Sequence, residues 1–430
     1  MHTTTLLQLC ALGLVVASGP LAYVWVKGNT AKYRKLVWVI LFLTFDLILF
    51  GAFTRLTDSG LGCPDWPGCY GHSNPLAAHG DIAAAEAAMP TGPVTVAKAW
   101  IEMLHRYLAM GVGVLIISLL AIAWVRRAEL KQSPWPAAAL LVLVCVQGAF
   151  GKWTVTLKLM PAIVTLHLLL AITLLCALGW LAARQIDAAT ATIPRAVARK
   201  YRVFALVCLV LLFAQIALGG WVSTNYAVLA CPDLPLCHGQ VLPQADFAGG
   251  FTLWRPLGML PNGELLPAAA LTAIHWTHRM GALVVFLVVG AFVGMFTVAC
   301  KRAGAAGSYE RKLGRMLNWL LLLQLATGVS NVLFTWPLAV AVAHNGGAAA
   351  LALLLAMLNS RLALRARAAD GVADGVADNT PRLPSHAMTA ATPILSPPSA
   401  NAAAAPPATA HGAASTAPAT APATSTIQAG

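Results

Sequence analysis

Charged residues are scarce in this chain of 430 residues. They make up 10% of it, against 59% hydrophobic residues, and only 15 residues are Asp or Glu. A soluble domain of this length needs a more polar surface, so the composition excludes that class and predicts a membrane protein with several spans. The net charge of +13 favours a nucleic-acid-binding surface less, because most basic residues gather in a few loops between apolar runs.

Cysteine pairs with the short spacing of most metal sites are also missing. Five of the nine cysteines lie in or at the ends of apolar runs, where a free thiol packs as a small hydrophobe. The other four lie in loops rich in Gly and Pro, as pairs with five residues between them. This spacing suits a small disulfide-closed loop if the loops face an oxidising compartment. A zinc site is the alternative, although metal pairs are usually closer together. The four residues are Cys63, Cys69, Cys231 and Cys237.

A stretch around the first cysteine pair occurs twice. Residues 51–71 read GAFTRLTDSGLGCPDWPGCYG, and 168 residues later the chain reads GGWVSTNYAVLACPDLPLCHG. Both copies contain Cys-Pro-Asp-x-Pro-x-Cys and follow an apolar run. The chain is therefore interpreted as a duplicated unit whose halves can be compared.

Nine apolar runs are long enough to cross a bilayer. The first lacks a basic start and a small-residue cleavage site, so we expect a retained helix and not a signal peptide. The predicted spans are 6–26, 36–53, 100–125, 135–151, 161–183, 201–222, 271–299, 316–335 and 337–362.

Lys and Arg lie mainly in alternate loops, namely 27–35, 126–134, 184–202 and 300–315, and at the start of the tail. Because basic loops stay on the cytoplasmic side, nine spans place the N-terminus outside and the C-terminus in the cytoplasm. Both cysteine-pair loops then face the oxidising side.

We expect an all-α integral membrane protein in four parts. These are an extra N-terminal transmembrane helix with a basic loop at 1–35, two pseudo-symmetric four-helix bundles at 36–190 and 191–367, and a tail at 368–430. The tail consists mostly of Ala, Pro, Thr and Ser, so it is predicted to be disordered and cytoplasmic.

Five histidines fall inside the predicted spans: His105, His167, His275, His278 and His344. Ionisable residues are costly within a bilayer and mark functional sites. A neutral histidine that is hydrogen-bonded between helices is the alternative for any one of them.

The duplication relates these histidines to each other. Residues 102–106 read EMLHR and residues 275–279 read HWTHR, so each motif has a titratable residue one turn before a His-Arg pair. Gln147 and Gln324 each precede a further histidine by 20 residues. Each half thus has one histidine near the outer end of its second span and one near the outer end of its fourth.

Two imidazoles from facing helices of a bundle favour haem ligation. Arg106 and Arg279 follow the first ligand of each half, where a guanidinium can pair with a haem propionate or extend to the membrane surface. Zinc or copper would need a tighter cluster of ligands. The first half has Glu102 where the second has His275, so the first half is predicted to be reactive and the second to hold a permanent haem.

Four features of the chain together resemble the haem A synthase family. They are the TRLT-x-SGL stretch from Thr54 to Leu61, the cysteine-pair loop, the Glu-x-x-His-Arg helix and the duplicated layout. The resemblance covers roughly residues 36–362. It implies two four-helix bundles related by a pseudo-twofold axis. It also implies an oxidoreductase that converts the C8 methyl group of haem O into the formyl group of haem A by successive hydroxylations, for cytochrome oxidase assembly.

The resemblance also implies roles for single residues. His105 and His167 would bind substrate haem O, His278 and His344 would ligate a haem b cofactor, and Glu102 would be the catalytic carboxylate. Cys63 and Cys69 match the family's disulfide, and the second pair occurs in some members only. His275 matches no family role.

Further expectations concern partners and location. The resemblance implies a bacterial inner-membrane protein that receives haem O from haem O synthase and electrons from a membrane donor, with neither zinc nor copper. The sequence leaves open whether a homo-oligomer forms. The alternative function is a di-haem b electron-transfer protein, in which all four histidines are fixed ligands. A thiol-disulfide oxidoreductase and a transporter fit less well, because the cysteines are too far apart and the site residues lie near the outer face.

Overall fold

The computed structural model describes residues 2–26, 32–130, 132–186 and 192–367. Within these ranges the chain is helical and contains no strand. Nine of the described helices are long and apolar enough to cross a membrane, which confirms the expected all-α, multi-pass membrane protein. They are α1 (His2–Val26), α2 (Lys32–Leu56), α4 (Val96–Val125), α6 (Trp135–Thr156), α7 (Pro161–Arg184), α8 (Arg195–Thr224), α10 (Ala268–Arg302), α11 (Tyr309–Leu333) and α12 (Leu338–Arg367).

Local signals fix where several of these helices begin. The hydroxyl group of Thr95 accepts the backbone N–H of Lys98 at 3.2 Å at the start of α4, and Ser308 accepts that of Arg311 at 3.3 Å at the start of α11. Both satisfy donors that have no partner within the helix. Pro161 is the first residue of α7, a position that needs no amide donor.

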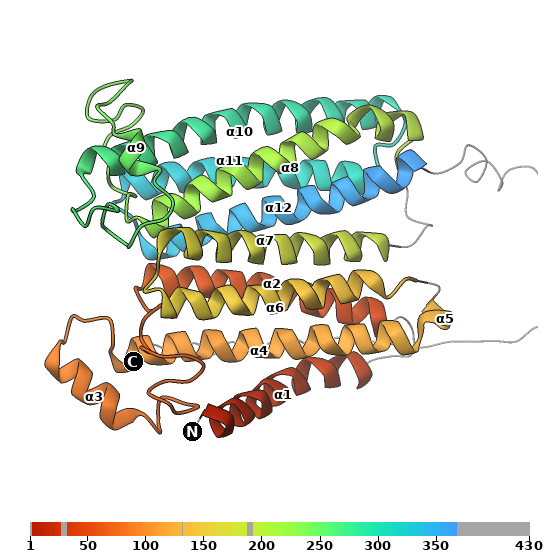
Figure 1. Ribbon diagram of the computed structural model, residues 1–430. Helices are drawn as coiled ribbons and strands as arrows, with labels where there is room; N and C mark the ends of the chain where they lie inside the picture. The colour runs from red at the N-terminus through yellow and green to blue at the C-terminus, as the bar shows by residue number, and fades with distance from the viewer. Residues whose placement is uncertain (1, 27–31, 131, 187–191, 368–430) are drawn as a thin grey trace, which may run out of the picture. The chain divides into compact units, whose positions relative to one another are not determined.

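The long helices form two rings of four. In the first ring α2 contacts α4, α4 contacts α6, α6 contacts α7, and α7 contacts α2. In the second ring α8 contacts α10, α10 contacts α11, α11 contacts α12, and α12 contacts α8. The rings meet where α7 and α2 pack against α12 and where α7 packs against α8 (Figure 1). Each ring has the layout of a four-helix bundle.

The extra helix α1 packs against the outside of the first ring, mainly on α4. A side chain added at Gly111 of α4 would meet Val16 of α1 at 2.6 Å, so glycine is required for this close approach. At the other end of the contact, the Thr5 hydroxyl donates to the carbonyl oxygen of Gly71 at 2.7 Å. The extra helix therefore supports the first cysteine-pair loop.

Backbone conformation repeats between the halves. Left-handed residues occur at matched places: after α2 and α8, after α6 and α11, and in the cysteine-pair loops. Such residues are uncommon outside glycine, so their recurrence supports the duplication inferred from sequence. The matched pairs are Asp58 with Tyr226, Lys158 with Thr335, Leu159 with Trp336, Tyr70 with His238, and Gly71 with Gly239.

Short helices lie at both ends of the rings. Helices α3 (His79–Ala88) and α9 (Phe247–Gly250) lie at one end, with both cysteine-pair loops, and α5 (Arg127–Leu130) lies at the opposite end (Figure 1). The sequence predicted no helix between the first loop and α4. The Ala-rich segment of α3 forms one nonetheless, because alanine has the highest helix propensity.

Several helices extend beyond their predicted spans. Helix α11 begins at Tyr309, seven residues before the predicted start, and includes the basic segment 311–315. Buried Glu310 in its first turn accepts a hydrogen bond from Arg361 of α12 at 3.1 Å, which compensates the charge. The domain limits at 35/36 and 190/191 stay predictions, and the expected disordered tail lies outside the described residues.

Candidate haem-binding and disulfide sites

Each cysteine-pair loop closes with a disulfide, Cys63–Cys69 in the first half and Cys231–Cys237 in the second. All four cysteines are at most 1% exposed. Each loop also contains an isolated antiparallel bridge that begins at its second cysteine. The two loops therefore share one structure as well as one sequence motif.

An aspartate organises the backbone of each loop. Asp65 accepts the backbone N–H groups of Tyr70 and Gly71, each at 2.7 Å. Asp233 accepts the equivalent groups of His238 and Gly239 at 2.7 and 2.8 Å. The hydrogen bond from Gly239, followed by that from His238, lowers the pKa of Asp233 below its usual value. These bonds explain why the repeated motif includes Asp.

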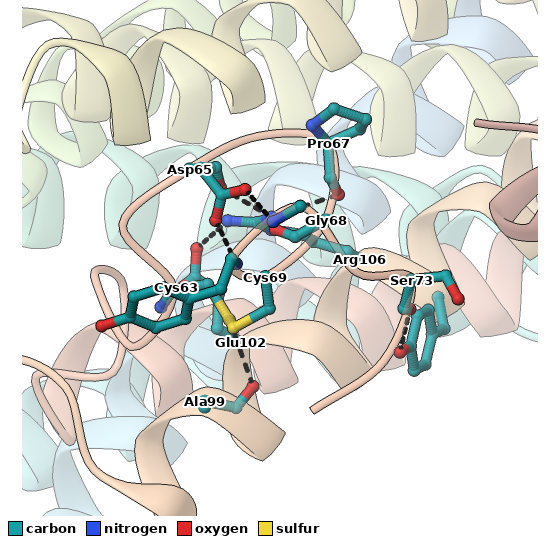
Figure 2. Close-up of a disulfide and its surroundings, with 12 residues drawn as sticks. Cys63, Asp65, Pro67, Gly68, Cys69, Ser73, Ala99, Glu102 and Arg106 are labelled. Carbon is teal, nitrogen blue, oxygen red and sulfur yellow. Dashed lines mark hydrogen bonds and ion pairs between the residues drawn. A yellow bond between two sulfur atoms is a disulfide. The ribbon is translucent and has the colours of Figure 1, made fainter. Parts of the chain in front are cut away.

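Arg106 and Glu102 of α4 form hydrogen bonds to the backbone of the first cysteine-pair loop (Figure 2). One amino group of Arg106 donates to the carbonyl oxygens of Asp65, Pro67 and Gly68, of which that of Gly68 is closest at 2.6 Å. The other amino group pairs with Oε1 of Glu102.

Glu102 also contacts the disulfide loop directly. Its Oε2 accepts the backbone N–H of Cys63 at 2.8 Å, and the residue is only 5% exposed. Glu102 thus bonds to the disulfide loop and lies one turn before His105 on the same helix.

The second half repeats this arrangement with a different side chain. Arg279 donates to the carbonyl oxygens of Asp233, Leu236 and Cys231 at 2.6–2.9 Å. His275 takes the place of Glu102, with its Nδ1 3.2 Å from the backbone N of Cys231 and its Nε2 3.3 Å from Nε of Arg279. A neutral imidazole has one acceptor nitrogen, so it can satisfy only one of these donors, whereas a carboxylate satisfies both.

The other four histidines lie on diagonal helices of the two rings. His105 of α4 and His167 of α7 are close enough to interact electrostatically, and so are His278 of α10 and His344 of α12. No direct packing of α4 on α7, or of α10 on α12, occurs among the described residues. Each pair therefore projects into the middle of its bundle from opposite sides.

Each of these histidines packs against a glycine of the neighbouring helix. A side chain added at the glycine would come within 3.0–3.3 Å of the imidazole ring. Such contacts are tighter than ordinary van der Waals packing, so the glycines create the space for the rings. The glycine–histidine pairs are Gly51 with His105, Gly151 with His167, Gly219 with His278, and Gly328 with His344.

The arrangement fits a haem in each bundle. Among the residues that the structure describes, no cluster of three or more His, Cys, Asp or Glu could hold a bare metal ion. A haem iron needs only axial ligands from the protein, and two imidazoles per bundle suffice. Near these rings, Nδ1 of His167 and the Oε1 atoms of Gln147 and Gln324 are buried without a hydrogen bond among the described residues. Such unpaired polar atoms are costly and are typical of a site that binds a ligand.

Comparison with known proteins identifies a family that matches this chain. The sequence profile of the COX15-CtaA cytochrome oxidase assembly proteins matches residues 34–357, which include most of both bundles and all four paired histidines.

The chain belongs to the cytochrome oxidase assembly protein family.

Curated relatives of the chain carry the name heme A synthase. The protein from Shewanella oneidensis is 38% identical over 335 residues, which cover 76% of this chain and 96% of the relative. The protein from Caulobacter sp. strain K31 is 30% identical over 341 residues, covering 73% and 91%. The protein from Allorhizobium ampelinum is 28% identical over 341 residues, covering 74% and 87%.

In this member of the cytochrome oxidase assembly family, the structure brings together most residues singled out by the sequence. Glu102, Arg106 and the first disulfide form one connected network, and the histidines pair within each half. The described hydrogen bonds of Arg106 and Arg279 go to the loops and to Glu102 and His275, so a bond from either arginine to a propionate stays a prediction.

Sequence reasoning missed two kinds of residue around the histidines. The glycine partners are separated from their histidines by 16 to 59 positions in the chain, and only the packing of helices reveals them. Gln215 was also missed, although it lies 2.9 Å from Nδ1 of His278. A glutamine in an apolar span was the available signal.

Proposed function

We propose that this protein is a haem A synthase, an oxidoreductase that converts the C8 methyl group of haem O into a formyl group. Family membership and the name shared by its relatives support the reaction. The observation that carries the assignment to this chain is the presence of two diagonal histidine pairs, of which only the first has a buried carboxylate one turn away.

The two bundles have different roles in this proposal. His105 and His167 bind haem O as substrate in the first bundle. His278 and His344 hold a haem b in the second bundle, where this cofactor supplies electron transfer. The ring contacts between α7 and α12 and between α2 and α12 place the two bundles side by side, which suits transfer of electrons between them.

Glu102 has both a structural and a chemical role. Each hydroxylation that uses O2 and two electrons from the donor also takes up two protons to form water, and a carboxyl group near the substrate can deliver them. Its hydrogen bond from Cys63 and its ion pair with Arg106 fix the position of the carboxylate and tie it to the loop above the site.

The membrane orientation follows from the basic loops. All described basic loop segments lie at the end opposite the disulfides. We therefore assign the protein to a bacterial inner membrane with its disulfides outside and its C-terminus in the cytoplasm. Haem O would come from haem O synthase, and electrons would come from a membrane donor.

The proposed function is tested in cells that make haem O but lack a haem A synthase of their own. Expression of this protein should produce haem A in extracted pigment. Glu102→Gln, which keeps the shape and one acceptor oxygen, should abolish haem A while the haem b spectrum persists. His278→Ala should remove the haem b spectrum. If Glu102→Gln makes haem A at the full rate, the chemical role of Glu102 is wrong; if the unaltered protein makes none, the function is wrong.

A further inference from the structure

The fourth span of each half carries a histidine in an almost identical setting. A shift of 177 residues places Gln147 on Gln324, Gly151 on Gly328 and His167 on His344. The same shift places Phe150 on Thr327, so one hydroxyl group distinguishes the two settings.

In the second half, Gln324 and Thr327 together define which nitrogen of the His344 ring carries the proton. The amide nitrogen of Gln324 lies 3.3 Å from Nε2 of His344 and can only donate, so the lone pair of the ring lies on Nε2 and its proton on Nδ1. Oγ1 of Thr327 lies 2.9 Å from Nδ1 and accepts this proton. Its own proton is donated to a backbone carbonyl oxygen, that of Leu323 at 3.0 Å or that of Gln324 at 3.1 Å. This is the tautomer in which Nε2 can bind iron.

In the first half, the corresponding ring has no such partner. The amide of Gln147 lies 3.4 Å from Nε2 of His167, as in the second half. Phe150 offers no hydroxyl group, and Nδ1 of His167 is buried without a hydrogen bond among the described residues. The amide nitrogen of Gln147 only donates, so it selects the same tautomer as in the second half, but the proton on Nδ1 of His167 has no acceptor among the described residues.

Hydrogen bonds to the distal nitrogen of a ligating imidazole orient the ring and raise its basicity, and their loss costs about 10-fold to 100-fold in metal affinity. We propose that Thr327 is a positioning residue that makes the second-half haem a retained cofactor. Its replacement by Phe150 leaves the first-half haem exchangeable, as a substrate that must enter and leave requires. This inference rests on the proposed function.

The test compares the purified full-length protein with three variants. Thr327→Val removes the hydroxyl group at nearly constant shape, and Thr327→Ser retains it. Thr297→Val is the matched control, because Thr297 also donates to its own helix, at 2.8 Å to the carbonyl oxygen of Val293, but its described hydrogen bonds involve no histidine. The readouts are the rate of haem b transfer to apomyoglobin, the reduction potential of haem b, and the low-spin electron paramagnetic resonance signal.

Thr327→Val should release haem b about 10-fold to 100-fold faster than Thr297→Val, with a higher reduction potential and a shifted resonance signal. Thr327→Ser should restore all three. Phe150→Thr should have the converse effect and slow the release of haem from the first bundle. Equal release rates and potentials for Thr327→Val and Thr297→Val would overturn the proposal, as would a Phe150→Thr variant that releases haem at the original rate.

Failure of this inference can be told apart from failure of the proposed function. Pigment extracted from the same samples is assayed for haem A. If haem A is present while the release rates do not respond to Thr327, the inference alone fails. If haem A is absent and both bundles retain haem B equally, the proposed function fails and the inference with it.

Discussion

Arg55 donates to the carbonyl oxygen of Ser223 at 2.7 Å, and these two residues hold the same place in the two halves of the duplicated chain. The guanidinium also bonds to the hydroxyl group of Tyr226 at 2.9 Å and lies 4.3 Å from the centre of its ring. That hydroxyl group donates to Asp58 at 2.7 Å. Equivalent turns at the ends of α2 and α8 thus bind each other, which joins the halves at the disulfide end.

Arg55→Gln should weaken this junction. The substitution removes charged hydrogen bonds to Tyr226 and Ser223, which are worth about 2 kcal/mol together after allowance for partial exposure. The midpoint of thermal unfolding in detergent should fall. The matched control is Arg126→Gln, whose ion pair with Glu129 is exposed and weak. An unfolding midpoint for Arg55→Gln equal to that of the control would show that the junction contributes nothing.

His275→Glu should stabilise the second disulfide loop. A carboxylate can accept both the backbone N–H of Cys231 and a donor of Arg279, as Glu102 does for the first loop. The gain should be about 1 kcal/mol, measured as a higher unfolding midpoint, and the haem b spectrum should not change. Loss of that spectrum would instead identify His275 as a haem ligand and contradict the assignment of His278.

Gly219→Ala should disturb the haem b site. Its added Cβ would lie 3.0 Å from Cε1 of His278, so the ring must move, at a cost of about 1–3 kcal/mol. Gly294→Ala is the control, because it adds a methyl group to the neighbouring helix α10 with no atom within 4 Å. We expect reduced haem b occupancy in the first variant only, read from the ratio of haem to protein absorbance. Equal occupancy in both would mean that Gly219 does not set the ring position.

Glu310→Gln should destabilise the end of the bundles opposite the disulfides. Glu310 is fully buried, and its Oε1 lies 3.1 Å from Nε of Arg361, which is 6% exposed. Removal of one partner leaves the other charge buried and uncompensated, at a cost of about 3–5 kcal/mol. The unfolding midpoint should drop well below that of the unaltered protein. The double variant Glu310→Leu with Arg361→Met should recover much of the loss, and its failure to do so would point to a different origin.

The sequence predicts the membrane spans and the duplication well, because long apolar runs and a repeated Cys-Pro-Asp motif are local signals. It also locates the histidine positions, since a histidine within an apolar span stands out. The sequence predicts too late a start for α11, because residues 310–312 and Arg315 are charged and the compensating Arg361 lies 51 positions from Glu310. The roles of Thr327 and Gly219 depend on which side chains meet between helices, and only the folded chain provides that information.

The central claim is that the two bundles hold different haems. It is tested most directly by the haem composition of the protein purified from cells that make haem O and from cells that do not. We predict haem B in both preparations, bound by the second bundle through His278 and His344, and haem O or haem A in addition only when haem O is made. Haem B in both bundles, in equal amount and regardless of haem O supply, would contradict the account and identify a di-haem electron-transfer protein.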